Sequence, residues 1–179
     1  MLLSRKKALQ TLAGSLFSLP LFSFSPKATR SAVAEFLESH KRSEKYTLAV
    51  FNQMPEDGMG FKPLPEMFTF QRHFVHCIEF VSGQLMARLG IKSPFDGVDL
   101  NKLSKEETKQ ALIQCYDWVE KTVVNATPQQ LAKTDSFGGD QVDLLRLLYI
   151  CENHLIHHRG TTMAYLRMKG IVPEGYVGW

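Results

Sequence analysis

Long apolar runs and paired cysteines are both missing from this sequence. No stretch reaches the roughly 18 consecutive apolar residues that a membrane-spanning helix needs, so no transmembrane span is expected. The cysteines Cys77, Cys115 and Cys151 form no Cys-x-x-Cys pair, which argues against a disulfide framework and against a sulfur-rich zinc site. Each cysteine lies in an apolar periodic segment, and we interpret all three as buried core residues.

An excess of positive charge is missing from most of the chain. The formal net charge is +3, but the first 30 residues hold five basic and no acidic side chains, which leaves residues 31–179 with 16 basic against 18 acidic ones. Affinity for nucleic acid depends on basic side chains that displace counterions from phosphates. No nucleic-acid partner is therefore expected.

Residues 1–30 are interpreted as an export signal with a short linker. The basic segment Ser4–Lys7 precedes the mostly apolar segment 8–24, which is the pattern of a secretory signal. It resembles a twin-arginine signal with one Arg replaced by Lys, so twin-arginine export and general secretion both stay open, and a periplasmic location is expected. Cleavage near Ser23–Ser25 or Ala32–Ala34 is weakly indicated. The alternative is an unprocessed arm on a cytoplasmic protein.

Residues 31–179 are predicted to form one all-α domain. Four long segments with helical periodicity alternate with loops that contain proline or glycine. The helices are expected at about residues 31–54, 69–89, 104–125 and 141–169, with a short turn at Thr127-Pro128 and no convincing strand. Four such helices around one apolar core predict a four-helix bundle.

Capping signals mark the ends of these predicted helices. Thr69 suits an N-cap, and Gly90 suits the left-handed residue that ends a helix. Ser104-Lys-Glu-Glu107 has the form of a capping box, in which the serine and the glutamate bind each other's backbone N–H groups. Asp140 is expected to cap the last and longest helix.

Five of the six histidines fall in two of the predicted helices, as His73 and His76 in one and His154, His157 and His158 in the other. His154 and His158 are about 40° apart around a helix and one turn along it, so both rings can reach one metal ion. Their stripe passes through the apolar face, where two charged imidazoles would be costly, whereas a metal ion binds the neutral form. His76 supplies a third nitrogen, and three ligands leave an open position, as in a reactive metal site.

Three segments together carry a resemblance to a known family. They are Met54-Pro-Glu with Phe61-Lys-Pro-Leu-Pro65, then Thr69-Phe-Gln-Arg-His-Phe-Val-His76, and finally His154-Leu-Ile-His-His158-Arg-Gly with Tyr165-Leu-Arg-Met-Lys-Gly170-Ile-Val-Pro173. Over about residues 35–176 the chain resembles the DinB family. The resemblance implies a four-helix bundle of up-down-down-up topology that holds a divalent metal, nickel or zinc, through three histidines.

Matched motif by motif, the resemblance places the metal ligands at His76, His154 and His158. His73 and His157 remain alternatives, and we interpret both as neighbours of the ligands or as exposed side chains. Arg159 is interpreted as a structural partner of a carboxylate or a helix end. Glu79 and Glu152 are interpreted as solvated charges, although either could accept a hydrogen bond from a ligand's second nitrogen. Core packing is the interpretation of Phe70, Phe74, Tyr116 and Trp118.

The resemblance implies a metal-dependent enzyme, because relatives include thiol S-transferases and a thiol-dependent isomerase. A metal ion with an open position can make a thiol or a water molecule nucleophilic. Thiol transfer is the leading hypothesis, and metal-assisted hydrolysis competes with it because an exported enzyme would seldom meet low-molecular-weight thiols. No catalytic residue is assigned, and the small-molecule substrate is unknown. The alternative is a non-catalytic metal-containing bundle that binds a small molecule or a protein, and a homodimer would be unsurprising.

Overall fold

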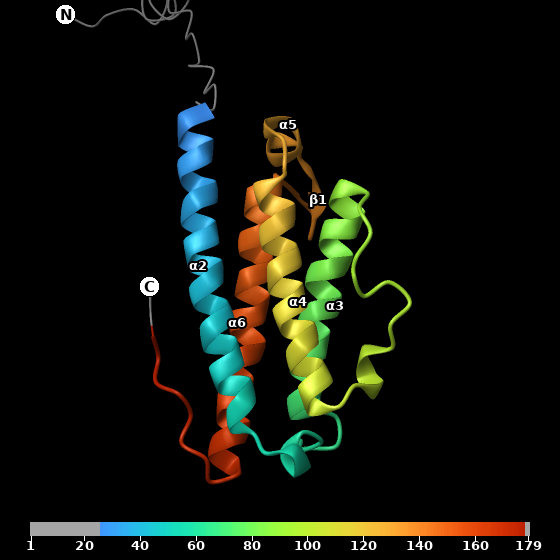
Figure 1. The fold of residues 1–179 in the computed structure, drawn as a ribbon, viewed down its shortest axis with the longest axis vertical. Helices are drawn as coiled ribbons and strands as arrows, with labels where there is room; N and C mark the ends of the chain where they lie inside the picture. The colour runs from blue at the N-terminus through green and yellow to red at the C-terminus, as the bar shows by residue number, and fades with distance from the viewer. Residues whose placement is uncertain (1–25, 178–179) are drawn as a thin grey trace, which may run out of the picture.

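Four long helices account for most of the structure, a computed structural model that describes residues 26–177 and is mostly helical, as predicted (Figure 1). The long helices are α2 (Pro26–Gln53), α3 (Phe70–Leu89), α4 (Lys105–Val124) and α6 (Leu144–Met168). The short elements are η1 (Glu56–Gly58), η2 (Leu100–Lys102), α5 (Pro128–Ala132), β1 (Asp135–Phe137) and β2 (Asp140–Val142).

The long helices pack side by side, with α3 against α6 and α4, and α2 against α4 and α6 (Figure 1). Helix α2 ends at the end of the molecule where α3 and α4 both begin. The connection 90–104, which links α3 to α4, runs back along the side of α3 that faces away from α4 in this view. The apolar faces enclose a common core, whose largest fully buried side chains include Phe36, Phe51, Phe70, Leu147 and Tyr165. Of the helices in residues 26–177, none combines the length and the hydropathy of a membrane span.

The caps predicted at Thr69, Gly90 and Ser104 lie at the observed helix ends. The Thr69 hydroxyl accepts a hydrogen bond from the Arg72 backbone N–H at 3.1 Å, and Gly90 ends α3 with a φ of 66°. Ser104 and Glu107 form both bonds of the capping box. These predictions are confirmed because a cap is made by residues within four positions of one another.

The start of α6 differs from the prediction. The helix begins at Leu144 and its N-cap is Asp143, whose carboxylate accepts a hydrogen bond from the Arg146 backbone N–H at 2.7 Å. Asp140 to Val142 instead form β2, which pairs antiparallel with β1. Gly138 and Gly139, with φ values of 60° and 94°, make the two-residue turn between the strands. Positive φ at both central positions is typical of such hairpins, so the prediction of no strand was wrong.

Helix α2 begins at Pro26, inside the segment 1–30 that the sequence assigns to the export signal and linker. The predicted signal core at 8–24 lies outside the described residues. The three cysteines are buried and unpaired, which confirms their interpretation as core residues.

Candidate functional site

Two packed helices carry the candidate site. Thr69 sets the start of α3, which places His73, His76 and Phe80 along one face at spacings of three and four residues. Helix α6 presents His154 and His158 one turn apart. Because α3 and α6 pack against each other along their length, the histidines of one helix meet those of the other.

The three histidines assigned as metal ligands lie together. His76, His154 and His158 each offer a ring nitrogen within 4.8 Å of the other two. The ring centroids are 5.0 Å apart for His76 and His154, 4.9 Å for His76 and His158, and 4.5 Å for His154 and His158. His154 and His158 therefore lie together as their spacing predicts, and His76 from α3 lies beside them.

The surroundings of this cluster favour uncharged imidazoles. Burial, followed by the other histidines, lowers the pKa of His158 to about 3. Burial also lowers the pKa of His154, with His76 and His157 adding to the effect. The pKa of His76 is lowered by burial and then by the Arg72 guanidinium, which outweighs the opposing Glu79. All three rings are neutral near pH 7, and the neutral form is the one that binds a metal ion.

One buried nitrogen of the cluster lacks a protein partner. His154 Nε2 is buried and makes no hydrogen bond with any described residue. Buried polar atoms without a partner are uncommon in folded proteins and carry a cost in stability. A cation held by the three rings would satisfy this atom, so the residues present fit a divalent metal ion with nitrogen ligands.

Aromatic side chains border the cluster on two sides. The Phe80 ring stacks on His154 at a centroid distance of 4.0 Å and an interplanar angle of 21°. Phe68 stacks on His158 at 6.2 Å and meets the edge of His76 at 5.3 Å, and it is 39% exposed. Phe68 therefore lies where the cluster meets the surface. The positions of Phe68 and Phe80 beside the cluster were not predicted from the sequence, although Phe80 lies one helical turn from His76.

The two alternative histidines have different surroundings from the three proposed ligands. His73 is buried, and its Nδ1 lies 2.8 Å from His158 Nδ1 while its Nε2 lies 3.2 Å from the Tyr165 hydroxyl. Both of its nitrogens are thus engaged within the protein. His157 is exposed, with its ring 5.0 Å from that of His158. The interpretation of these two residues as a neighbour of the ligands and an exposed side chain agrees with the structure.

The charged residues beside the histidines were only partly predicted. Glu79 pairs with Arg72 at 2.8 Å on the partly exposed face of α3, in keeping with a surface charge. Glu152 is 8% exposed, so its interpretation as a solvated charge was wrong. Arg159 is also buried and binds hydroxyls instead of the expected carboxylate or helix end. Glu152 and Arg159 point into the core because α2 packs against that side of α6.

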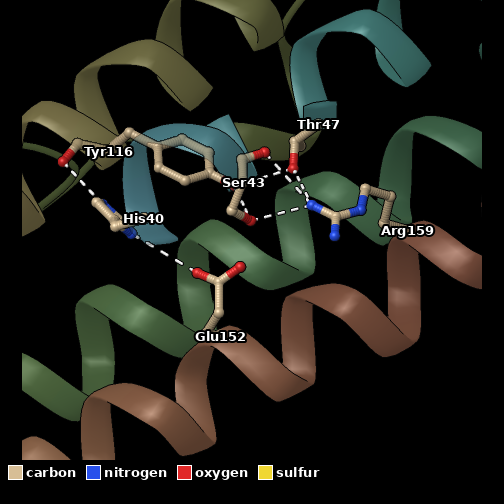
Figure 2. A network of polar contacts seen from close by, with 6 residues as sticks. All are labelled: His40, Ser43, Thr47, Tyr116, Glu152 and Arg159. Atoms are coloured by element: carbon tan, nitrogen blue, oxygen red, sulfur yellow. Dashed lines mark hydrogen bonds and ion pairs between the residues drawn. The ribbon is translucent and has the colours of Figure 1, made fainter. Parts of the chain in front are cut away.

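A buried polar network lies on that side of α6, and Figure 2 shows its six residues, His40, Ser43, Thr47, Tyr116, Glu152 and Arg159. Arg159 Nη1 donates to Ser43 Oγ and to Thr47 Oγ1, each at 3.0 Å. The Tyr116 hydroxyl lies 2.9 Å from Thr47 Oγ1. Burial, with the Glu152 charge adding to it, raises the pKa of Tyr116 well above its usual value. These contacts join α2, α4 and α6 through their polar side chains.

The sixth histidine, His40, belongs to this network. Its Nε2 donates to the backbone carbonyl of Tyr116 at 3.2 Å, and its Nδ1 faces the Glu152 carboxylate at 3.6 Å (Figure 2). A cavity of about 30 Å³ adjoins His40 and Glu152, and its wall includes all three cysteines. This network was not predicted from the sequence. The signal was the polar row of His40, Ser43 and Thr47 at helical spacing in α2.

Comparison with known proteins gives two kinds of match. A family model described as the DinB superfamily matches residues 39–162. Two solved structures are similar in fold, a DinB-like protein from Bacillus subtilis (TM-score 0.61, 20% identity, 82% of this chain and 96% of that one) and a DinB-like protein from Bacillus cereus (TM-score 0.64, 19% identity, 80% and 96%). No curated protein matches the chain.

Proposed function

The chain belongs to the DinB superfamily, and on this basis we propose that it is a divalent-metal-dependent enzyme whose ion is held by His76, His154 and His158. The partnerless, buried Nε2 of His154 is the observation that carries the proposal. The up-down-down-up four-helix bundle of this family is part of the proposal. It is supported by the packing and directions of α2, α3, α4 and α6 in Figure 1.

The donor set suits nickel or zinc, the two metals that the resemblance to the family implies. Imidazole nitrogens suit zinc, nickel, copper and iron, whereas magnesium and calcium prefer oxygen ligands. The cluster that the fold brings together consists of imidazoles. The cysteines lie around the cavity beside His40 and Glu152, where burial raises the pKa of Cys77, Cys115 and Cys151.

Thiol transfer is the reaction that the site supports best. A divalent ion would supply Lewis acidity, which makes a thiol or a water molecule nucleophilic near neutral pH. The nearby carboxylate of Glu79 is paired with Arg72, so it is poorly placed to act as a general base for water. An external thiol, with an ordinary pKa of about 8.5, needs far less assistance to ionise than water does. In this reaction the thiol loses its proton to solvent, and its sulfur forms a bond to an electrophilic carbon of the substrate. The bond from that carbon to the leaving group breaks, and the leaving group departs with the electron pair.

The protein's own side chains would orient and shield the reacting groups. Neutral imidazoles from α3 and α6 would hold the divalent ion. Phe68 and Phe80 cover two sides of the histidine cluster with apolar surface. Such walls exclude water and suit a substrate with an apolar part. Metal-assisted hydrolysis is the second candidate, and the proposed export favours it because reduced thiols are scarce outside the cytoplasm.

Metal content tests the ligand assignment. We expect purified wild-type protein to contain about one nickel or zinc ion per chain, and the double variant His154→Ala/His158→Ala to lose at least about nine-tenths of it, because two of three ligands are removed. His157→Ala is the matched control, since it removes an exposed histidine from the same helix. Elemental analysis makes the measurement. Equal metal content in wild type and the double variant would contradict the proposal.

Activity measurements separate the candidate functions. Wild-type protein, loaded with metal or stripped by a chelator, would be given thiols with electrophilic acceptors, and separately esters and amides. Metal-dependent turnover of the first set supports thiol transfer, and turnover of the second supports hydrolysis. Inactivity of metal-loaded protein toward both sets would favour the alternative, a non-catalytic metal-containing bundle that binds a small molecule or a protein.

Export from the cytoplasm is a separate part of the proposal, and it rests on the basic and apolar pattern of residues 1–24. Helix α2 begins at Pro26, so cleavage after Ser25 would leave the helix whole, whereas cleavage after Ala34 would remove its first turns. Cell fractionation and the mass of the mature chain test this. Full-length protein confined to the cytoplasm would contradict export.

A further inference from the structure

A chain of hydrogen bonds connects His158 to the polypeptide backbone through two other buried side chains. His158 Nδ1 lies 2.8 Å from His73 Nδ1, and His73 Nε2 lies 3.2 Å from the Tyr165 hydroxyl. That hydroxyl donates to the backbone carbonyl of Phe68 at 3.1 Å. His73, His158 and Tyr165 are each at least nine-tenths buried, so the two contacts that His73 makes are shielded from solvent, whereas the bond to the Phe68 carbonyl is partly buried.

The backbone carbonyl of Phe68, at the end of this series of hydrogen bonds, sets the direction of every bond in the series. A carbonyl oxygen can only accept, so the single proton of the Tyr165 hydroxyl goes to Phe68. The tyrosine oxygen then accepts from His73 Nε2–H. A neutral His73 with its proton on Nε2 has a lone pair on Nδ1, which must accept from His158 Nδ1–H. Only this arrangement satisfies all three contacts at once.

We propose that His73 is a positioning residue that holds His158 as the Nδ1–H tautomer, so that the Nε2 lone pair of His158 is the one available to a divalent cation. Tyr165 in turn fixes the tautomer of His73, and the Phe68 carbonyl anchors the chain. The inference rests on the proposed function, because it concerns a metal ligand assigned there.

The other two proposed ligands are positioned differently. His154 is held by the stacked Phe80 ring, and its Nε2 makes no hydrogen bond with the protein. His76 meets the edge of Phe68 at a centroid distance of 5.3 Å. Ligand histidines usually bind a protein partner through their second nitrogen, and loss of that partner typically lowers metal affinity about 10- to 100-fold. In this site His73 is the partner, and His158 is the ligand that depends on it.

Three variants test the assignment. His73→Asn places an amide oxygen where it can accept from His158 Nδ1–H, so we expect zinc affinity within about threefold of wild type. His73→Leu has similar bulk and no acceptor, so we expect a loss of about 10- to 100-fold. Tyr165→Phe frees the tautomer of His73 and should give a smaller loss. His157→Leu, on the exposed side of α6, is the control and should bind zinc like wild type.

Two measurements are needed. Competition with a chromophoric chelator gives the zinc affinity, and circular dichroism confirms that each variant is folded. In metal-free protein, ¹⁵N NMR of the histidine rings reports which nitrogen of His158 carries the proton. We expect Nδ1–H in wild type and in His73→Asn, and a mixture of tautomers in His73→Leu. A merely structural role for His73 would not be rescued by asparagine.

The outcomes separate this inference from the proposed function. If wild type binds zinc and folded His73→Leu binds it equally well, the inference is overturned and the metal site stands. An Nε2–H tautomer of His158 in wild type overturns the inference as well. If wild type binds neither zinc nor nickel, the proposed function fails, and the positioning role fails with it. Should the leucine variant not fold, the Tyr165→Phe affinity and the wild-type tautomer decide the matter.

Discussion

Helix α6 carries a different polar cluster on each of two sides. Toward α3, His154 and His158 meet His76 at the edge of the protein, and a buried nitrogen of His154 is left without a partner. Toward α2 and α4, Arg159 and Glu152 lie inside the core. There Arg159 Nη1 donates to two hydroxyls, and even His40 Nδ1, which makes no hydrogen bond, faces the Glu152 carboxylate (Figure 2).

The difference between these clusters is in what satisfies their polar atoms. In the buried network most polar atoms are paired with other protein groups and His40 Nδ1 is the exception, so removing a member should cost stability. In the histidine cluster the buried Nε2 of His154 has no protein partner, so removing a member should weaken the binding of the proposed metal ion. His158 and Arg159 are neighbours in sequence, and a rotation of about 100° around the helix separates one role from the other.

The largest stability effect is expected in the buried network. Arg159→Met should lower the free energy of unfolding by about 2–3 kcal/mol, because it removes charge-assisted hydrogen bonds to Ser43 and Thr47. Urea denaturation measures this, with the exposed Arg146→Met as control, expected within about 0.5 kcal/mol of wild type. Metal content should stay unchanged. A loss of metal in folded Arg159→Met would break the distinction between the two clusters.

A pH dependence should come from the histidine side. Folding lowers the pKa of His158 to about 3 and that of His73 to about 4, in both cases chiefly through burial. Below the ordinary histidine pKa of about 6.5, the unfolded chain binds more protons than the folded one. The stability of metal-free protein should therefore be full above about pH 6.5 and fall as the pH drops toward 3.

At about pH 5 the loss should be on the order of 1–2 kcal/mol for each of the two rings. Urea denaturation of metal-free protein between about pH 7.5 and pH 5 measures it. In His73→Asn, the part of this pH-dependent loss of stability that comes from His73 should disappear. In Arg159→Met, the free energy of unfolding should depend on pH as strongly as in wild type. Stability that does not change over this range would contradict the assignment of neutral, buried rings.

The smallest stability effect is expected at the edge of the site. Phe68→Ala should change the free energy of unfolding by less than about 1 kcal/mol, since the side chain is 39% exposed. It should also uncover His76 and His158, which its ring contacts. Faster modification of these histidines by diethyl pyrocarbonate, mapped by mass spectrometry, measures the exposure. Unchanged rates would show that Phe68 does not shield the cluster.

Short-range signals made parts of the fold predictable. Thr69, Ser104 and Gly90 act on backbone groups within a few residues of themselves. Helix α3 begins and ends, and α4 begins, where these residues predict. At Asp140 two local signals competed, because an aspartate can cap a helix and the preceding Gly138-Gly139 can turn a hairpin. The pairing of β1 with β2 decided between them, and Asp143 became the cap.

The candidate site was predictable in its members and less so in its surroundings. His154 and His158 share a helix face by spacing alone, and His76 lies in the apolar stretch of another helix. Glu79 and Glu152 look alike in sequence, yet Glu79 pairs with Arg72 near the surface and Glu152 lies in the core. Their environments depend on which neighbouring helix covers each face.

The amino-acid sequence by itself determined the long helices, most of their caps and the two histidine-bearing segments, because periodicity and capping act over one or two turns. Only the tertiary structure decided that His73 reaches His158 and that Arg159 reaches Ser43. These pairs are separated by 85 and 116 positions in the chain. Such contacts depend on how α2, α3 and α6 are rotated relative to one another. The packing of the whole core determines these rotations.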